Sequence, residues 1–135
     1  KAMEFLTELR ASIPGMFNGS RSGGEVWRAV DAEIRSAGYT NIHEKYPFSV
    51  LGHRIHFHNS EGPSVGFMNF GWQSYWSLLS RGLFGQLLNQ NFEGDLRGLW
   101  TIEPHIGGLG FGVKFEEILV VEAAGARWLE EEIFV

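Results

Sequence analysis

The first hydrophobic pattern of the chain has a helical period. Residues 2–13 carry apolar side chains at Phe5, Leu6, Leu9 and Ile13. Spacings of three and four residues place such side chains on one face of a helix. Pro14 and Gly15 disfavour helix, so we expect the helix to stop before them.

A second helical pattern follows a glycine-rich loop. Its apolar residues are Val26, Val30, Ile34 and Ala37. Ser22 precedes the pattern and Glu25 stands three residues later, which is the spacing of a capping box. Gly38 predicts the end of this helix. Both helices are amphipathic, so each needs a sheet or other helices to cover its apolar face.

The pattern changes after residue 38. Residues 39–60 are rich in aromatic and β-branched side chains and predict short strands with a turn near Pro47. Residues 61–71 predict a loop. Residues 72–92 predict a helix over at least part of their length. We expect one side of that helix to face the core through Trp72, Trp76, Leu79 and Leu83.

The last third of the chain predicts a β-hairpin. Strands 99–106 and 111–122 flank the sequence GGLG, whose glycines supply the backbone freedom of a tight reversal. With a four-residue turn, Glu103 faces Lys114, and Glu116 lies one pleat along on the same side. The full set on this face is Thr101, Glu103, His105, Lys114 and Glu116.

The opposite face of the predicted hairpin is apolar. It carries Trp100, Ile102, Val113, Phe115, Leu119 and Val121. Glu117 also falls on this side, and we expect its carboxylate to reach the rim of the sheet or an interaction partner. A shift of one residue in register would move one glutamate to the other face, so these assignments depend on the pairing.

Glu103 and Glu116 are the candidate metal ligands of the hairpin. Diagonal neighbours on one face lie about 5–8 Å apart at Cβ. Carboxylates at that distance repel each other unless a cation lies between them, and hard divalent cations are the usual partners. In the alternative interpretation the glutamates face water and Lys114 pairs with Glu103 at a small energetic gain. Spacing alone leaves both interpretations open.

Three further candidates are histidines in the sequence GHRIHFH. His56 and His58 share one face of a strand and His53 points to the other, so the run is not a simple three-ligand zinc motif. Neutral imidazole suits Zn, Mn, Fe or Co. On the Glu103 face of the hairpin, His105 is the candidate for contact with a substrate.

Composition narrows the class of protein. The 135 residues suit one domain or part of one, and the 44% of hydrophobic residues can form a core. A net charge of −5 without a dense Lys/Arg stretch argues against nucleic acid as a partner. The absence of cysteine excludes disulfides and thiolate metal sites and is compatible with the cytoplasm. No apolar run is long enough to span a membrane.

Four segments of the chain resemble, in the same order, segments of one known enzyme family. The family's tIEPg strand is similar to GLWTIEPHIG, residues 98–107, and its terminal GvRiEddvLVte hairpin to GVKFEEILVVEAAGARWLEEE, residues 112–132. Its GHgiGl-vHe segment is similar to VLGHRIHFH, residues 50–58, and its preceding helix to PGMFNGSRSGGEVWRAVDAEIRSAGY, residues 14–39. The family is the pita-bread metallopeptidases: methionine aminopeptidase, aminopeptidase P, prolidase and the non-peptidase creatinase.

The resemblance implies an α+β fold with residues 1–135 as a single domain. This domain would be the second half of a pita-bread fold, in which helices pack on a curved, mainly antiparallel sheet. The family holds two divalent metal ions, Mn, Co, Zn or Fe, with two aspartates, one histidine and two glutamates. Carried over by motif, the metal ligands of this chain are His53, Glu103 and Glu116, of which Glu116 bridges both ions.

The chain departs from the family pattern at several ligands. The two metal-binding aspartates lie upstream of the segments matched here, and no aspartate of this chain corresponds to them. The family's second histidine falls on Ser60, so His58 or His56 would have to replace it. The histidine of the proline-specific members falls on Ser49, so a preference for proline is not supported. We therefore expect weak metal binding by this chain, or none. Since Lys1 opens directly into a helical pattern, we also expect a fragment of a longer protein.

The resemblance implies a metal-dependent exopeptidase, similar to aminopeptidase P and prolidase, as the parent protein. It would hydrolyse the N-terminal bonds of short peptides with a metal-bound hydroxide. Glu103 would help to position the nucleophile, and His58 or His105 would stabilise the oxyanion. Two alternatives remain: an inactive binding module of the same fold, and a creatinase-like hydrolase of a non-peptide substrate. We expect little or no activity from this chain alone.

The expected partners follow from the same interpretation. They comprise a short peptide substrate, no nucleic acid and no membrane, in a cytoplasmic protein. A half-domain leaves a sheet edge and an apolar face uncovered, so we also expect a homodimer or other self-association.

Overall fold

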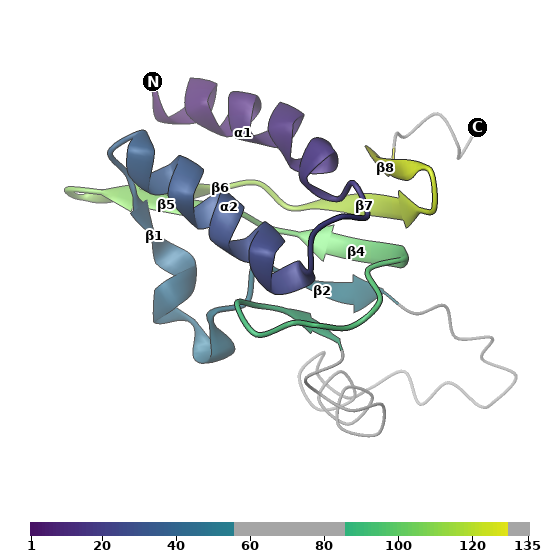
Figure 1. Ribbon diagram of the computed structural model, residues 1–135. Helices are drawn as coiled ribbons and strands as arrows, with labels where there is room; N and C mark the ends of the chain where they lie inside the picture. The colour runs from purple at the N-terminus through teal and green to yellow at the C-terminus, as the bar shows by residue number, and fades with distance from the viewer. Residues whose placement is uncertain (56–85, 130–135) are drawn as a thin grey trace, which may run out of the picture.

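A computed structural model of the protein describes residues 1–55 and 86–129. Two helices pack on antiparallel strands, which confirms the expected α+β class (Figure 1). The helices are α1 (Ala2–Met16) and α2 (Gly23–Ser36), followed by two short 3-10 helices, η1 (Ile42–Lys45) and η2 (Pro47–Ser49).

The strands form two antiparallel sheets. Their bounds are β1 (Thr40–Asn41), β2 (Gly52–Ile55), β3 (Leu87–Leu88), β4 (Gly98–Ile102), β5 (His105–Gly108), β6 (Phe111–Lys114), β7 (Glu117–Glu122) and β8 (Gly125–Trp128). One sheet has the strand order β1-β5-β6, and the other has the order β3-β2-β4-β7-β8. Every pairing among the described strands is antiparallel.

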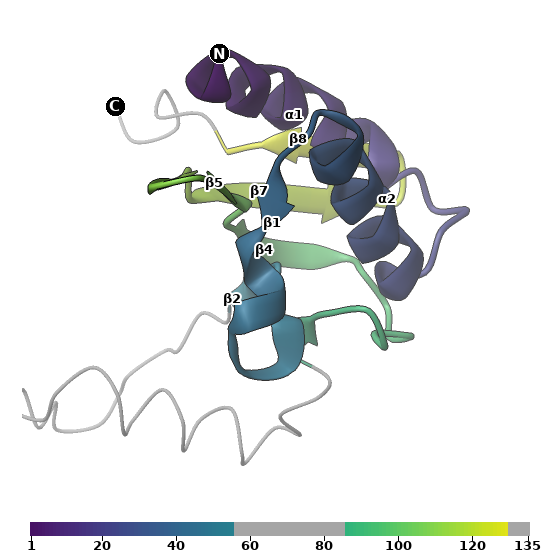
Figure 2. The ribbon, with the colours of Figure 1, turned by 90° about the vertical axis from the view of Figure 1, so that its left-hand side faces the viewer.

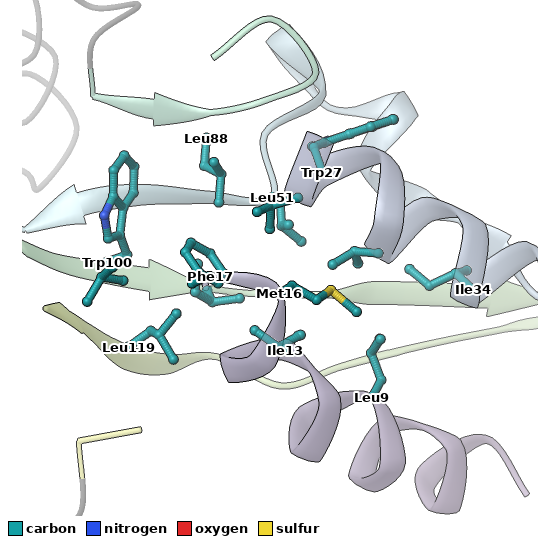
Figure 3. Packing of buried hydrophobic residues seen from close by; sticks show 14 of the residues in the cluster. Leu9, Ile13, Met16, Phe17, Trp27, Ile34, Leu51, Leu88, Trp100 and Leu119 are labelled. Atoms are coloured by element: carbon teal, nitrogen blue, oxygen red, sulfur yellow. The ribbon is translucent and has the colours of Figure 1, made fainter. Parts of the chain in front are cut away.

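The core lies between the helices and one face of the five-stranded sheet. Figures 1 and 2 show both helices on the same side of that sheet. The helices contribute Leu6, Leu9, Ile13, Met16, Val26, Trp27, Val30 and Ile34, all buried. Figure 3 shows several of them pointing toward Trp100, Leu119 and Leu88 on the strands. The two predicted apolar stripes are confirmed, except that Ala37 is exposed at the end of α2.

The first helix continues past its predicted end. It includes Pro14 and Gly15 and ends at Met16. Pro14 has no N–H to donate to the carbonyl four residues earlier, that of Arg10. The indole Nε1 of Trp128 donates to that carbonyl instead, at 2.9 Å. The missing helical bond is thereby replaced, and burial of Met16 in the core favours the last turn.

The second helix begins as the sequence predicts. The Ser22 hydroxyl accepts from the Glu25 N–H at 3.3 Å, and the Glu25 carboxylate accepts from the Ser22 N–H at 2.7 Å. This is the predicted capping box. Gly38 follows the helix with φ +82°, a left-handed conformation that favours glycine.

The middle of the chain differs from expectation. The expected strands are present as β1 and β2, but η1 and η2 stand between them where we expected a turn. The predicted helix over 72–92 lies largely outside the described residues. Its described part, 86–92, is not helical: Leu87 and Leu88 form β3, which pairs with β2. Burial of Leu88 on the sheet outweighs a weak helical preference.

The C-terminal hairpin forms, but with a shorter turn than expected. Strands β5 and β6 are joined by Leu109 and Gly110, and Lys114 lies opposite His105 rather than Glu103. The pairing is shifted by two residues from the predicted one, so each side chain stays on its predicted face. Strands β4 and β7 pair in the same register as β5 and β6, and a break at Glu103 separates the two pairings.

That break is the corner between the two sheets. Residues 103–104 connect β4 to β5, and residues 115–116 connect β6 to β7. Pro104 has no N–H to donate to a strand ladder, which suits such an interruption. Both candidate glutamates therefore stand at the corner.

Candidate functional site

Glu117 belongs to the fold rather than to a ligand site. It pairs with Ile102 on the helix-covered face. Its two carboxylate oxygens accept from Nε and Nη2 of Arg10 on α1, each at 2.6 Å. The carboxylate thus reaches the rim of the sheet, as expected, and links α1 to β7.

Glu103 and Glu116 converge on a single positive charge. The Lys114 Nζ lies 3.0 Å from Oε2 of Glu103 and 3.5 Å from Oε2 of Glu116. The side chains of Lys114, Glu103 and Glu116 are 44%, 22% and 53% exposed. The hydrogen bond to Glu103 is the main cause that raises the pKa of Lys114. The two carboxylates therefore share a cation, and that cation is an ammonium group.

The backbone around Glu103 is tied to the strand that carries His53. The Glu103 N–H donates to the carbonyl of Leu51 at 3.0 Å. His53 lies opposite Thr101, so the two share the face of the sheet that the helices leave uncovered. Gly52 makes this close pairing possible, because a Cβ there would lie 2.1 Å from the carbonyl oxygen of Thr101.

A complete metal cage is not assembled in the described part of the chain. Within residues 1–55 and 86–129, no three or more His, Asp or Glu side chains are grouped so that they could hold a metal ion. Glu103 and Glu116 come together, and His53 lies on a neighbouring strand without joining them. His58 and His56 lie outside the described residues.

His43, for which the sequence offered no role, is fully buried beneath the corner. Its Nδ1 lies 2.7 Å from the carbonyl oxygen of Val50, and its Nε2 accepts from the backbone N–H of His105 at 2.8 Å. Because Nε2 accepts, Nδ1 carries the proton and donates to Val50. Burial lowers the pKa of His43. A neutral imidazole of fixed tautomer thus joins η1 to the start of β5.

The side chain of His105 is hydrogen bonded through one ring nitrogen and lies close to a glycine through the other. Its Nδ1 is hydrogen bonded to the hydroxyl of Tyr46. Its Nε2 lies over Gly112, where a Cβ would come within 3.0 Å. Burial lowers the pKa of His105, and the nearby charge of Lys114 lowers it further. The contact of Tyr46 could not be predicted from the sequence, because Tyr46 lies 59 residues from its partner.

A separate cavity opens at a different place on the surface. Its volume is about 330 Å³, and it shares no residue with the cluster at the corner. It is lined by Phe17, Gly19, Arg21, Gly94, Asp95, Leu96, Arg97, Val121, Glu122 and Ala123. Arg97 pairs with Asp95 at 2.6 Å, and this bond lowers the pKa of Asp95 to about 2.

Comparisons with known proteins give no match: no protein-family model, no curated protein and no solved structure is similar to the chain. Within residues 1–55 and 86–129, no helix has both the length and the apolar character needed to cross a membrane.

Proposed function

We propose that this chain supplies part of the divalent-metal site of a pita-bread-type metallopeptidase. The observation that carries the proposal is the convergence of Glu103 and Glu116 on one cation, with Nζ–Oε2 distances of 3.0 and 3.5 Å. The fold supports it, since two helices cover one face of an antiparallel sheet and leave His53 on the other.

These residues are not grouped into a metal site within residues 1–55 and 86–129, so the proposal rests on the chemistry of their donor atoms. Glu103 and Glu116 offer carboxylate oxygens, and His53 offers an imidazole nitrogen. When bound, divalent ions supply Lewis-acid activation of water and of an amide carbonyl. The remaining ligands, two aspartates by the family resemblance, would come from another part of the parent protein.

In this proposal His105 contacts the substrate. If the Tyr46 hydroxyl donates to Nδ1, the proton of His105 resides on Nε2. That N–H is then the group that would hydrogen bond to the carbonyl oxygen as negative charge develops on it. His58 stays a second candidate for this role and lies outside the described residues.

A second candidate function is that of a binding module without metal. It is favoured by the position of Lys114, which already neutralises much of the charge of Glu103 and Glu116. In this alternative the three side chains form a structural ion pair at the corner, and no divalent ion binds.

The two candidates are separated by calorimetric titration of the full chain with Mn²⁺ and Co²⁺. We expect weak, saturable binding that Glu103→Gln and Glu116→Gln each reduce by about ten-fold or more. Glu122→Gln is the matched control, because it removes an exposed carboxylate at the end of β7, and it should leave the affinity unchanged. Binding that survives both site substitutions would contradict the proposal. In the parent protein, unchanged hydrolysis of short peptides by Glu116→Ala would do the same.

A further inference from the structure

We infer that the cavity of about 330 Å³ beside the turn between β7 and β8 is a binding site for a free α-amino acid with an apolar side chain. Its walls come from three segments that lie together at one end of the five-stranded sheet (Figures 1 and 2). They are the loop between α1 and α2, the loop before β4, and the end of β7 with its turn. The cavity shares no residue with the corner, so this site is independent of the proposed metal function.

Apolar side chains form the inner wall of the cavity. Phe17 and Val121 line it and are only 2% and 6% exposed, so they also belong to the core. Leu96 lines it as well and packs against that core, and Ala123 adds a small apolar side chain. An apolar group of a ligand would lose contact with water here, which favours its binding. Ligand sites usually measure about 300–1,000 Å³, so a cavity at the lower end suits a molecule as small as one amino acid.

The charged side chains at the rim leave one cation and one anion without a partner. Arg97 and Asp95 neutralise each other, with Nη2 at 2.6 Å from Oδ2. Within the described part of the chain, the exposed side chains of Arg21 and Glu122 make no ion pair or hydrogen bond. A guanidinium and a carboxylate beside one cavity match the carboxylate and the ammonium of a zwitterion. A ligand with a single charge would instead be repelled by Glu122 or by Arg21.

The loop before β4 is fixed by two side chains of the sheet. Arg54 on β2 donates to the carbonyl oxygens of Asp95 and Arg97, the latter at 2.5 Å. The indole Nε1 of Trp100 donates to the carbonyl of Leu96 between them, at 2.7 Å. The guanidinium carbon of Arg54 also lies 4.4 Å from the centre of the Trp100 ring. Three successive carbonyls are thus held in place, which reduces the entropy lost when this wall orders around a ligand.

The test is titration of the full chain with L-leucine, followed by the amide signals in NMR spectra. We expect a dissociation constant of about 0.1–1 mM, because the ligand is small and its charged ends stay partly hydrated. Leucinamide lacks the carboxylate and N-acetylleucine lacks the ammonium, so each should bind about ten-fold more weakly. Glycine lacks the apolar side chain, and we expect no measurable binding of it.

Two substitutions test the assigned contacts. Arg21→Gln and Glu122→Gln each remove one charge from an exposed side chain, so the fold should be kept and the affinity for leucine should fall about ten-fold. The matched controls are Arg127→Gln and Glu8→Gln. Both remove an exposed charge that lines no part of the cavity, and both should leave the affinity unchanged.

The inference is supported if leucine shifts the amide signals of Gly19, Gly94 and Ala123 and if both site variants weaken this effect. No shift of these signals at about 20 mM leucine would overturn it. Equal affinity for leucine and for either blocked analogue would also overturn it, because one charged end would then not be recognised. So would an affinity that neither site substitution changes.

Discussion

The buried histidine at the corner gives the most stringent test of the fold around the candidate site. His43 makes two hydrogen bonds, from Nδ1 to the Val50 carbonyl at 2.7 Å and from the His105 N–H to Nε2 at 2.8 Å. His43→Phe fills a similar volume but leaves both backbone groups unpaired. Each such buried group costs about 1–3 kcal/mol, so we expect a loss of about 2–6 kcal/mol in the free energy of unfolding. A protein of this size has about 5–15 kcal/mol in total.

A second variant separates the two bonds. His43→Gln can place an acceptor near the position of Nε2 and so keep the bond from the His105 N–H, while losing the donor to Val50. One unpaired group predicts a smaller loss, about 1–3 kcal/mol. If both variants unfold with the same free energy as the unmodified chain, the assigned bonds do not stabilise the corner.

The same residue predicts a direction for the pH dependence of stability. Burial lowers the pKa of His43 in the folded state below its ordinary value of 6.5. The unfolded chain therefore binds the proton at a higher pH than the folded chain does. The contribution of His43 to the free energy of unfolding is fully present above about pH 6.5. It is lost as the pH drops toward the lower folded-state pKa, by at most about 1.4 kcal/mol per pH unit for one proton.

The assay is urea unfolding followed by tryptophan fluorescence from pH 5 to pH 8. The free energy of unfolding of the unmodified chain should fall below about pH 6.5. In both His43 variants its slope against pH should be smaller, by an amount that corresponds to at most one bound proton. His105 titrates in all three proteins, so the difference between them isolates His43. A decline of equal slope in the unmodified chain and in His43→Gln would refute the assignment of a buried, neutral His43.

Three further substitutions test contacts outside the candidate site. Glu117→Gln weakens the two-bond pair with Arg10 and should lower the free energy of unfolding in urea by about 1 kcal/mol. Because 1 M salt screens the pair in the unmodified chain, the difference between the two proteins should shrink at that salt concentration. Equal stability at low salt would mean that the pair does not hold α1 to β7. Trp128→Phe leaves the Arg10 carbonyl without its indole donor and should lower the free energy of unfolding by about 1–3 kcal/mol, and no change in the midpoint would count against the account of the helix that passes through proline. Gly52→Ala places a Cβ 2.1 Å from the Thr101 carbonyl and should disrupt the pairing of β2 with β4, so a variant with a native melting curve would contradict the described register.

The helices could be predicted because their signals are local. The apolar spacing of α1 and the reciprocal bonds of Ser22 and Glu25 involve residues within one or two turns. The end of α1 could not be predicted, because the donor that compensates for Pro14 is Trp128, 118 residues from the carbonyl of Arg10 that it serves.

The sequence predicted the face of the hairpin on which each side chain lies, but not the register in which the two strands pair. Alternation alone assigns the sides of a strand, and it placed Glu103, Glu116 and Lys114 together correctly. The turn length is set by the backbone of Leu109 and Gly110, and a glycine-rich sequence permits several turns. The prediction was therefore shifted by two residues, an even number that preserves the face of every side chain.

The support beneath the site was the hardest part to predict. His43 and Tyr46 stand in a segment without periodic pattern, and their partner His105 is distant in the sequence, 62 and 59 residues away. Nothing near either residue marks the contact. Such bonds depend on how the two sheets meet at the corner, which only the tertiary structure determines.

The most direct test of the central claim locates the metal ion itself. Crystals of the chain soaked in Mn²⁺ can be measured at a wavelength where manganese scatters anomalously. The proposed function predicts an anomalous peak between the carboxylate oxygens of Glu103 and Glu116. A fully soaked crystal with no peak at this position, and with the ammonium still between the two carboxylates, would contradict it.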